Sequence, residues 1–376
     1  KGRIYKYRVH VNAQDKEVVQ VQNKRVTTHD IAKITGFSRG TVDRALNNRG
    51  RISESTRKLI LAKAQELGYV PNKLARSLAL KQRITIGAIF PSQPEFFFDR
   101  IKDGMKAAEK EFKDFGLSVD YLLTETHDAM KEIELLEELL KRQPKGILLA
   151  PAHPLLLNGV IDRAAEEGIP TVTFNSDAPL SKRLCFIGQN LVESGRIAGE
   201  LLGKFLNGSG KVAILTGFDE VLALRQRVEG FIEEITEYFP GLSFVGPFEY
   251  YDNEVNAYNI TKRILKDISD LKGIYATSAA GTKGAGEAVD EFGKNRDIKI
   301  VGFDVDSNTG KMLRANTIHA AICQDPYAQG YYSVKIMFKH LTEGFVPVKK
   351  NLYTRLDILL RESIDKNNDN NYLYRI

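Results

Sequence analysis

Cysteine is scarce in this sequence, since only Cys185 and Cys323 occur among 376 residues. So few thiols exclude a disulfide-stapled scaffold and a cysteine-rich zinc site, and they are typical of a reducing compartment. A chain of this length does not need such staples, because about 100 to 200 residues make a domain with a sizeable core. We therefore expect two or three globular domains and no structural metal.

Long apolar runs are missing as well. No segment approaches the roughly 18 apolar residues of a membrane span, and the opening KGRIYKYRVHVNAQDKEVVQ contains no stretch of signal-peptide length. We expect a cytoplasmic protein without a membrane partner. No pairing of His with Ser or Cys at usable spacing indicates a nucleophile. NGSGKV lacks the spacing of a phosphate loop, and GTKGAG is a lone glycine cluster, more typical of a close-packed helix start than of a dinucleotide site. We expect no enzyme, no catalytic residues and no cofactor.

Negative charge is scarce in the first part of the chain. Residues 1–83 contain 19 Lys and Arg but only 6 Asp and Glu, whereas the remaining residues contain 35 against 42. The net charges are therefore +13 and −7. Such a division is typical of a module that binds phosphate backbones, attached to a neutral or acidic body.

Three short helices are predicted in the basic part. Thr28, Ser38 and Ser53 are suitable N-caps, and Gly36 and Gly68 follow the first and third helices. The third helix, ESTRKLILAKAQEL, is expected to bury one face, which consists of Leu59, Ile60, Ala64 and Leu67. The small Ala32 and the turn at Gly36 are typical of a helix-turn-helix.

The second of these helices lies in GFSRGTVDRALNNRGRIS, which contains four arginines. Its apolar residues recur at helical spacing and should face inward, namely Val42, Ala45 and Leu46. This orientation turns Gly40 and Arg44 outward and leaves Arg39 in the exposed first turn. Arginine can pair with guanine in a major groove, while Ser38 and Thr41 suit phosphates.

From residue 84 onward, apolar strands alternate with amphipathic helices. Predicted strands include ITIGAIF, LSVDYLL, GILLAP, TVTFN and LCFIG, followed by KVAILTG, LSFVGPFEY, KGIYAT, IKIVGFD and HAAIC. Alternation of this kind predicts parallel sheets with helices on both faces. We predict a small all-α helix-turn-helix domain followed by a two-lobed α/β body with two doubly wound parallel sheets and a ligand crevice at the strand ends.

The segments VTTHDIAKITGFSRGTVDRALNN and RISESTRKLILAKAQELGYVPNKLARSLALKQR, followed at once by ITIGAIF, closely resemble the lactose-repressor (LacI/GalR) family of bacterial transcription regulators. The resemblance covers about residues 26–362. It implies operator reading by Arg39, Gly40 and Arg44, and it implies contacts near the DNA backbone from Thr27, His29, Ser38, Thr41, Asn47 and Ser53. It also makes NKLARSLA a hinge helix, with Lys73 as a backbone contact and Leu78 as a minor-groove wedge.

The two-lobed body is similar to periplasmic sugar-binding proteins of the ribose-binding type. This similarity implies a sugar cleft lined by Phe97, Phe98, Asn175, Asp177, Arg225, Ser278, Asp304 and Gln324. Aromatic rings suit the C–H face of a sugar, and polar groups suit its hydroxyls. Arg227 is interpreted as a surface ion pair. Sugar binders of this type carry an Asn-Asp pair where this chain has Ser278 and Ala279, which suits a deoxy, phosphorylated or otherwise altered sugar.

These observations predict a homodimeric transcriptional repressor that binds a palindromic double-stranded operator and responds to a small sugar-like effector. The expected parts are an N-terminal extension (1–25), a helix-turn-helix domain (26–70), a hinge helix and linker (71–83), a sugar-sensing and dimerisation domain (84–362) and a tail (363–376). Two alternatives stay open. One is a monosaccharide-binding protein without a DNA function, and the other is an α/β enzyme that uses GTKGAG for a nucleotide.

Overall fold

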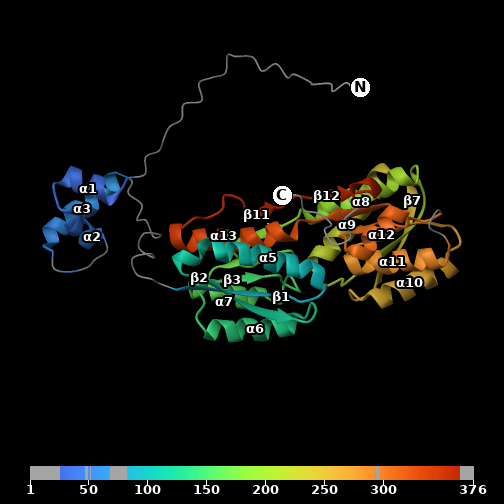
Figure 1. Cartoon of the computed structure of the whole chain (residues 1–376), viewed down its shortest axis with the longest axis horizontal. Helices are drawn as coiled ribbons and strands as arrows, with labels where there is room; N and C mark the ends of the chain where they lie inside the picture. Colours follow the sequence, from blue (N-terminus) through green and yellow to red (C-terminus); the bar gives the residue numbers. More distant parts are fainter. Residues whose placement is uncertain (1–25, 47–49, 51, 68–82, 294–296, 365–376) are drawn as a thin grey trace, which may run out of the picture. The chain divides into compact units, whose positions relative to one another are not determined.

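The computed structural model describes residues 26–46, 50, 52–67, 83–293 and 297–364 (Figure 1). The chain divides into two compact units, residues 1–72 and 73–376. The expected N-terminal extension lies outside the described residues, as does nearly all of the expected hinge and tail. Three expected DNA contacts also lie outside them, namely Asn47, Lys73 and Leu78.

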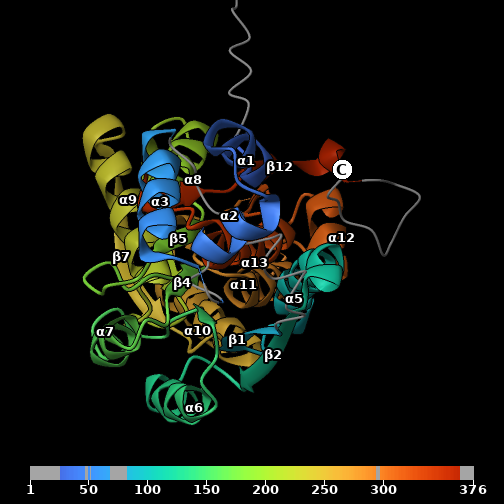
Figure 2. The same cartoon turned by 90° about the vertical axis from the view of Figure 1, so that its left-hand side faces the viewer.

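The described part of the first unit is a bundle of three helices that pack against one another (Figure 2). They are α1 (Thr28–Thr35), α2 (Arg39–Leu46) and α3 (Glu54–Glu66). The side chain of Thr27 caps α1 in a reciprocal pair with Asp30, so the expectation that Thr28 is the cap was wrong by one residue. Gly36 ends α1 with a φ of 73°, a left-handed conformation that suits glycine. This turn sets the direction in which α2 leaves α1.

The core of this unit forms where the apolar faces of the helices meet, and it contains Ile31, Val42, Ala45, Ile60 and Ala64. Ser38 and Ser53 accept hydrogen bonds from the backbone N–H groups of Thr41 and Thr56, as the sequence predicts for N-caps. Leu59 does not join this core and is 52% exposed. Successive side chains of an α-helix are rotated by about 100° around its axis, so Leu59 lies beside the buried face to which its neighbour Ile60 belongs.

The second unit contains two six-stranded sheets, one in each lobe (Figure 1). In spatial order the first sheet consists of β11 (Asn351–Tyr353), β5 (Cys185–Gly188), β4 (Thr171–Phe174), β3 (Gly146–Leu149), β1 (Ile84–Pro91) and β2 (Leu117–Thr124). The second consists of β12 (Asp357–Leu359), β10 (Ala320–Cys323), β9 (Lys299–Phe303), β8 (Leu271–Ala276), β6 (Ser209–Thr216) and β7 (Gly241–Glu249). All pairs are parallel except β10 with β12. The predicted fold class is confirmed.

Helices cover both faces of each sheet. On the first sheet, α5 (Glu95–Phe112) and α13 (Pro326–Glu343) pack on one face, and α6 (Ala129–Lys141) and α7 (Asn158–Glu166) pack on the other. On the second sheet the two layers are α8 (Leu191–Phe205) with α9 (Leu222–Tyr238), and α10 (Glu254–Asp267) with α11 (Ala279–Glu291) and α12 (Ser307–Ala315). The short 3-10 helices η1 (Lys113–Phe115) and η2 (Arg361–Ser363) complete the described elements.

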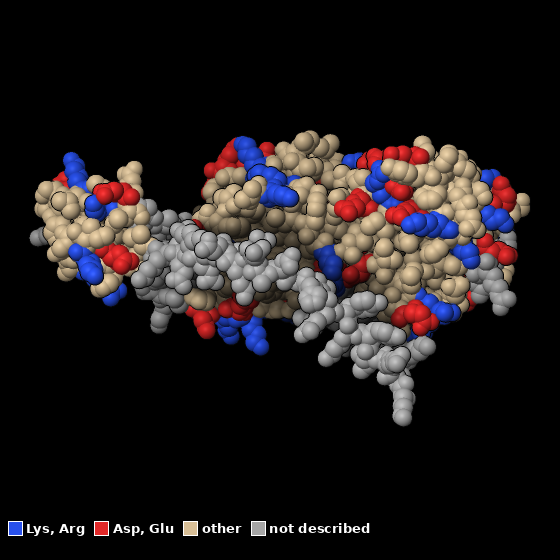
Figure 3. Space-filling view, turned by 90° about the horizontal axis from the view of Figure 1, so that it is seen from above, with Lys and Arg blue, Asp and Glu red and all other residues tan. Residues whose placement is uncertain are grey.

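Three short segments connect the lobes, between β5 and α8, between β10 and α13, and between β11 and β12. Both sheets therefore direct the carboxyl ends of their strands toward the region between the lobes, where open α/β sheets bind ligands. On the face drawn in Figure 3, Lys and Arg are interspersed with Asp and Glu over the two lobes. This mixed surface contrasts with the basic composition of residues 1–83.

Two close helix crossings depend on glycine. A Cβ atom at Gly195 of α8 would lie 2.1 Å from the carbonyl oxygen of Arg227 in α9, and one at Gly230 of α9 would lie 2.1 Å from the carbonyl oxygen of Val192. The first lobe repeats this arrangement between Gly104 of α5 and α13. Glycine therefore fixes the position of α9 against α8, and with it the position of Arg227.

We predict that Gly195→Ala lowers the free energy of unfolding by roughly 1 to 3 kcal/mol, because the added methyl group must push the two helices apart. Gly159→Ala is the matched control, since a Cβ there meets nothing within 4 Å inside α7. The control should be neutral or stabilising by up to about 1 kcal/mol. Urea unfolding of both variants measures the difference, and equal stability of the two would contradict the close crossing.

Candidate functional site

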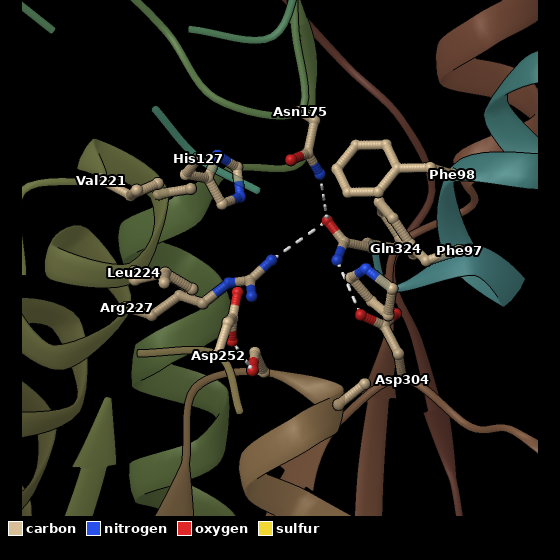
Figure 4. Close-up of a pocket in the computed structure, with 14 residues that line it drawn as sticks. Phe97, Phe98, His127, Asn175, Val221, Leu224, Arg227, Asp252, Asp304 and Gln324 are labelled. Atoms are coloured by element: carbon tan, nitrogen blue, oxygen red, sulfur yellow. Dashed lines mark hydrogen bonds between the residues drawn. The ribbon is translucent and has the colours of Figure 1, made fainter. Parts of the chain in front are cut away.

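A cleft lies between the lobes at the carboxyl ends of the strands (Figure 4). Its cavity volume is about 40 Å³, far below the roughly 300 to 1,000 Å³ of a typical ligand site, so the lobes would have to move apart to admit a small molecule. The first lobe contributes Pro94, Phe97, Phe98, His127 and Asn175. The second lobe contributes Val221, Ala223, Leu224, Arg227, Asp252, Ser278, Ala279 and Asp304, and Gln324 enters from the segment that leads back to the first lobe.

Gln324 is the hydrogen-bonding centre of the cleft, and its side chain is buried. Its Oε1 accepts from Nε2 of Gln189, in the segment between β5 and α8, at 2.6 Å, and it lies 3.4 Å from Asn175 Nδ2 of the first lobe. The same oxygen accepts from Arg227 Nη2 of the second lobe at 3.0 Å, while Gln324 Nε2 donates to Asp304 Oδ2 at 2.8 Å. One side chain therefore joins polar groups of both lobes (Figure 4).

Arg227 is the cleft's buried cation. Its Nη1 donates to the backbone oxygen of Thr277 at 2.6 Å, and its guanidinium lies 3.9 Å from the centre of the Phe303 ring. Burial lowers the pKa of Arg227, and the negative charge of Asp304 opposes this effect. The residue stays charged because its ordinary pKa is far above neutrality.

The expectation for Arg225 needs correction. Its side chain is 42% exposed and lies 3.7 Å from Glu229, outside the residues that line the cleft. Residues two positions apart in an α-helix are rotated by about 200° around the helix axis, so Arg225 and Arg227 point to opposite sides of α9. The sequence contained the signal, because Arg227 shares a helical face with the buried Leu224 and Phe231. The surface ion pair expected for Arg227 is made by Arg225.

Asp177 also lies outside the cleft lining. It is buried, and its Oδ2 accepts a hydrogen bond from Arg183 Nη2 at 2.6 Å. Thr173 and the backbone N–H of Ala178 donate to its other oxygen. With its acceptors used in this way, Asp177 fixes the loop after β4 and thereby positions its neighbour Asn175, which does face the cleft (Figure 4).

The other expected residues come together. Phe97 and Phe98 are buried at the start of α5, and their rings meet edge to face with centres 5.3 Å apart. Both line the cleft, although they also belong to the core of the first lobe. Asp304 lies at the end of β9 with a φ of 55°, and Ser278 precedes α11. These residues offer an apolar wall on one side of the cleft and hydrogen-bonding groups on the other.

Two polar residues of the cleft, His127 and Asp252, were absent from the sequence prediction. His127 lies in the loop after β2, and its Nδ1 is buried without a hydrogen-bond partner. Burial lowers its pKa, which keeps the imidazole neutral at neutral pH, while Asp252 opposes the shift. The hydroxyl of Ser278 donates to Asp252 (Figure 4). Neither residue carried a local sequence signal, because both lie in loops whose positions depend on the tertiary fold.

Burial also raises the pKa of Asp304 from 3.8 to about 6, although Arg227 and Gln324 favour its ionised form. Between these pH values the native carboxyl holds a proton that the unfolded chain has released. Stability therefore falls as pH rises through this interval, and the full cost is present above pH 6.

We predict that Asp304→Asn removes this dependence, since an amide does not titrate and asparagine tolerates the left-handed backbone. Relative to the unchanged chain, the variant should gain up to roughly 3 kcal/mol in unfolding free energy between pH 4 and pH 7. Urea unfolding of both proteins across this range is the measurement. Parallel pH profiles would show that Asp304 is not the group that titrates.

In the first unit, the exposed side of α2 presents Arg39, Gly40 and Arg44. Arg44 Nε donates to the backbone oxygen of Gly40 at 3.0 Å. A Cβ atom at Gly40 would have ordinary contacts only, at 3.8 Å and beyond, so the fold does not require glycine there. Thr27, His29, Ser38 and Ser53 are also exposed and Thr41 is partly exposed. Three of these five residues, Thr27, Ser38 and Ser53, cap the helix N-termini, and His29 and Thr41 lie in the first turns of α1 and α2.

A three-helix unit of helix-turn-helix form, followed by a two-lobed α/β body with a polar cleft, defines a DNA-binding regulator built on a binding-protein fold. The model of the bacterial regulatory proteins of the lacI family matches residues 27–72, and that of the periplasmic binding protein domain matches residues 86–344. Over most of its length the chain therefore belongs to the periplasmic binding protein domain family, and it carries a lacI-family regulatory domain at residues 27–72.

Similar proteins include regulators and sugar-binding proteins. ExuR of Bacillus subtilis, named a probable HTH-type transcriptional repressor, is 29% identical over 74% of this chain and 81% of its own length. The ribose operon repressor of Halalkalibacterium halodurans is 27% identical over 84% of this chain and 90% of its own. The solved structure of GanP, a glucose-galactose binding protein from Geobacillus stearothermophilus, is 26% identical, with a TM-score of 0.70, and the match covers 75% of this chain and 99% of GanP.

Two further observations bear on the kind of protein. Of the helices that the structure describes, none is long and apolar enough to cross a membrane. Within the described residues, no group of three or more His, Cys, Asp or Glu side chains could hold a metal ion.

Proposed function

We propose that this chain is a transcriptional repressor whose affinity for its operator changes when a small sugar-like molecule binds between the two lobes. The observation that carries this proposal is the presence on one chain of a helix-turn-helix unit with exposed arginines and a two-lobed unit with a polar cleft. Each unit alone occurs in proteins with other functions, but together they combine a DNA-binding domain with a ligand-sensing domain.

The DNA-binding role rests on α2. Its inner face is buried, so Arg39 and Arg44 are free to reach the edges of bases in a major groove. We propose the remaining contacts from the family resemblance. Backbone contacts would come from Thr27, His29, Ser38, Thr41, Asn47, Ser53 and Lys73, and Leu78 would enter the minor groove. The net charge of +13 on residues 1–83 supports a large electrostatic contribution to binding.

The sensor role rests on the cleft between the lobes. Phe97 and Phe98 offer apolar rings for the C–H face of a sugar, and Asn175, Arg227 and Asp304 offer hydrogen-bonding groups for hydroxyls. Gln324, which is hydrogen-bonded to residues of both lobes, would help to hold the lobes together around the bound sugar. The names of two similar proteins, a ribose operon repressor and a glucose-galactose binding protein, agree with this class of ligand.

We also propose a homodimer that binds a palindromic operator. A single helix-turn-helix unit reads one half-site, and two-fold symmetry of the protein then matches two-fold symmetry of the DNA. Because a repressor must share a compartment with the chromosome, its location would be the cytoplasm. The sensor domain would bring the two helix-turn-helix units together.

The test is to select binding sites from random double-stranded DNA with the full chain and with two variants. Arg44→Ala should lose roughly 1 to 3 kcal/mol of discrimination at one base pair in each half-site, because a bidentate contact to a base is removed. Lys58→Ala removes an exposed cation from α3 and is the matched control. This variant should select the same DNA sequence motif as the unchanged chain.

Two outcomes would contradict the proposal in different ways. Identical motifs for the unchanged chain and Arg44→Ala would show that Arg44 does not read a base. Failure to enrich any sequence, together with binding of a sugar, would instead favour a solute-binding protein without a DNA function.

A further inference from the structure

The carboxylate that the sequence lacks at Ala279 is supplied by a different strand end. Ala279 follows β8, whereas Asp252 follows β7, two strands away in the order β8, β6, β7. The loop after β7 carries Asp252 into the cleft with a φ of 48° (Figure 4). The cleft thus regains an acidic group, but at a new position.

Neighbouring residues are arranged to hold this carboxylate. The hydroxyl of Ser278 donates to Asp252 Oδ1, and the hydroxyl of Tyr250 lies 2.7 Å from Ser278 Oγ. A Cβ atom at Gly217 would lie 2.6 Å from Asp252 Oδ1, so glycine there leaves the space that the carboxylate occupies. Ser278 therefore fixes Asp252, and because none of the described residues donates to the second carboxylate oxygen, that oxygen remains for a ligand.

The charges that line the cleft are two carboxylates, Asp252 and Asp304, and one guanidinium, Arg227. Arg227 already donates to Thr277 and Gln324 and lies over Phe303. With His127 neutral, the lining has a formal charge of −1. A phosphate or carboxylate on the ligand would meet this negative field, whereas hydroxyl groups would donate to the free carboxylate oxygens.

We propose that the effector is an uncharged monosaccharide whose hydroxyls donate to Asp252 and Asp304, and that the cleft rejects phosphorylated sugars and sugar acids. This inference rests on the proposed sensor function and narrows its ligand class. Of the alternatives that the loss of the Asn-Asp pair left open, it excludes the phosphorylated sugar. Asp252 would determine specificity by favouring hydroxyl donors and repelling anions.

The experiment compares matched sugars on the full-length protein by thermal shift, followed by calorimetry for those that bind. The pairs are D-ribose with D-ribose 5-phosphate, D-glucose with D-glucose 6-phosphate and D-glucuronate, and D-galactose with D-galacturonate. We expect at least one neutral sugar to stabilise the protein and to bind at least about 10-fold more tightly than its anionic partners.

The outcomes separate this inference from the proposed function. An anionic sugar that binds as tightly as its neutral parent would overturn the inference while leaving a sugar sensor in place. A panel in which no member, neutral or anionic, stabilises the protein would contradict the sensor function itself.

Asp252→Asn tests the residue directly, since asparagine has nearly the same shape and tolerates positive φ. It should weaken binding of the neutral sugar by about 10-fold or more and reduce the preference over the anion. Asp267→Asn, an exposed position at the end of α10, is the matched control and should preserve both values. If Asp252→Asn keeps the affinity and the preference, Asp252 does not determine specificity.

Discussion

The side-chain oxygen of Gln324 is the constraint on which the cleft depends, because it accepts hydrogen bonds from both lobes. Asn175 of the first lobe and Arg227 of the second lie 3.4 and 3.0 Å from this one atom, and Gln189 of the segment between β5 and α8 donates to it at 2.6 Å. Arg227 is buried and must find acceptors inside the protein, since a desolvated cation without partners is costly. Gln324 therefore supports the cleft's only lining cation among the described residues and joins the lobes through the same atom.

Much of the fold was predictable because it follows from local patterns. Alternating strands and helices identified both sheets, and serine caps and Gly36 placed the first three helices. Errors arose where a shift of one or two residues along a helix decides which side chain is buried. Leu59 lies beside the buried face of α3, and Arg225 was chosen although Arg227 shares the buried face of α9. In both cases a strict helical count favours the correct residue, as Ile60 and Arg227 show.

The chemistry of the cleft was less predictable, because it is assembled from loops that are distant in sequence. His127 and Asp252 follow different strands in different lobes, and nothing in their local sequence marks them. Asp177 shows the opposite failure, since it stands two residues from Asn175 but its oxygens are occupied by Arg183, Thr173 and Ala178. The spacing of residues in the sequence predicts which side chains lie at the end of a strand. The hydrogen bonds that these side chains form within the protein determine which of them remain available to a ligand.

The central claim is that an effector bound beside Arg227 controls operator affinity, and an effector can shift that equilibrium only if it binds one state more tightly. The most direct measurement is the concentration of effector that produces half of the full change in operator affinity, compared for the unchanged chain, Arg227→Lys and Arg225→Ala. Arg227→Lys keeps the charge but loses the forked donors, so it should require about 10- to 100-fold more effector while still binding operator in its absence. Arg225→Ala should respond like the unchanged chain, and a normal response by Arg227→Lys would contradict the account.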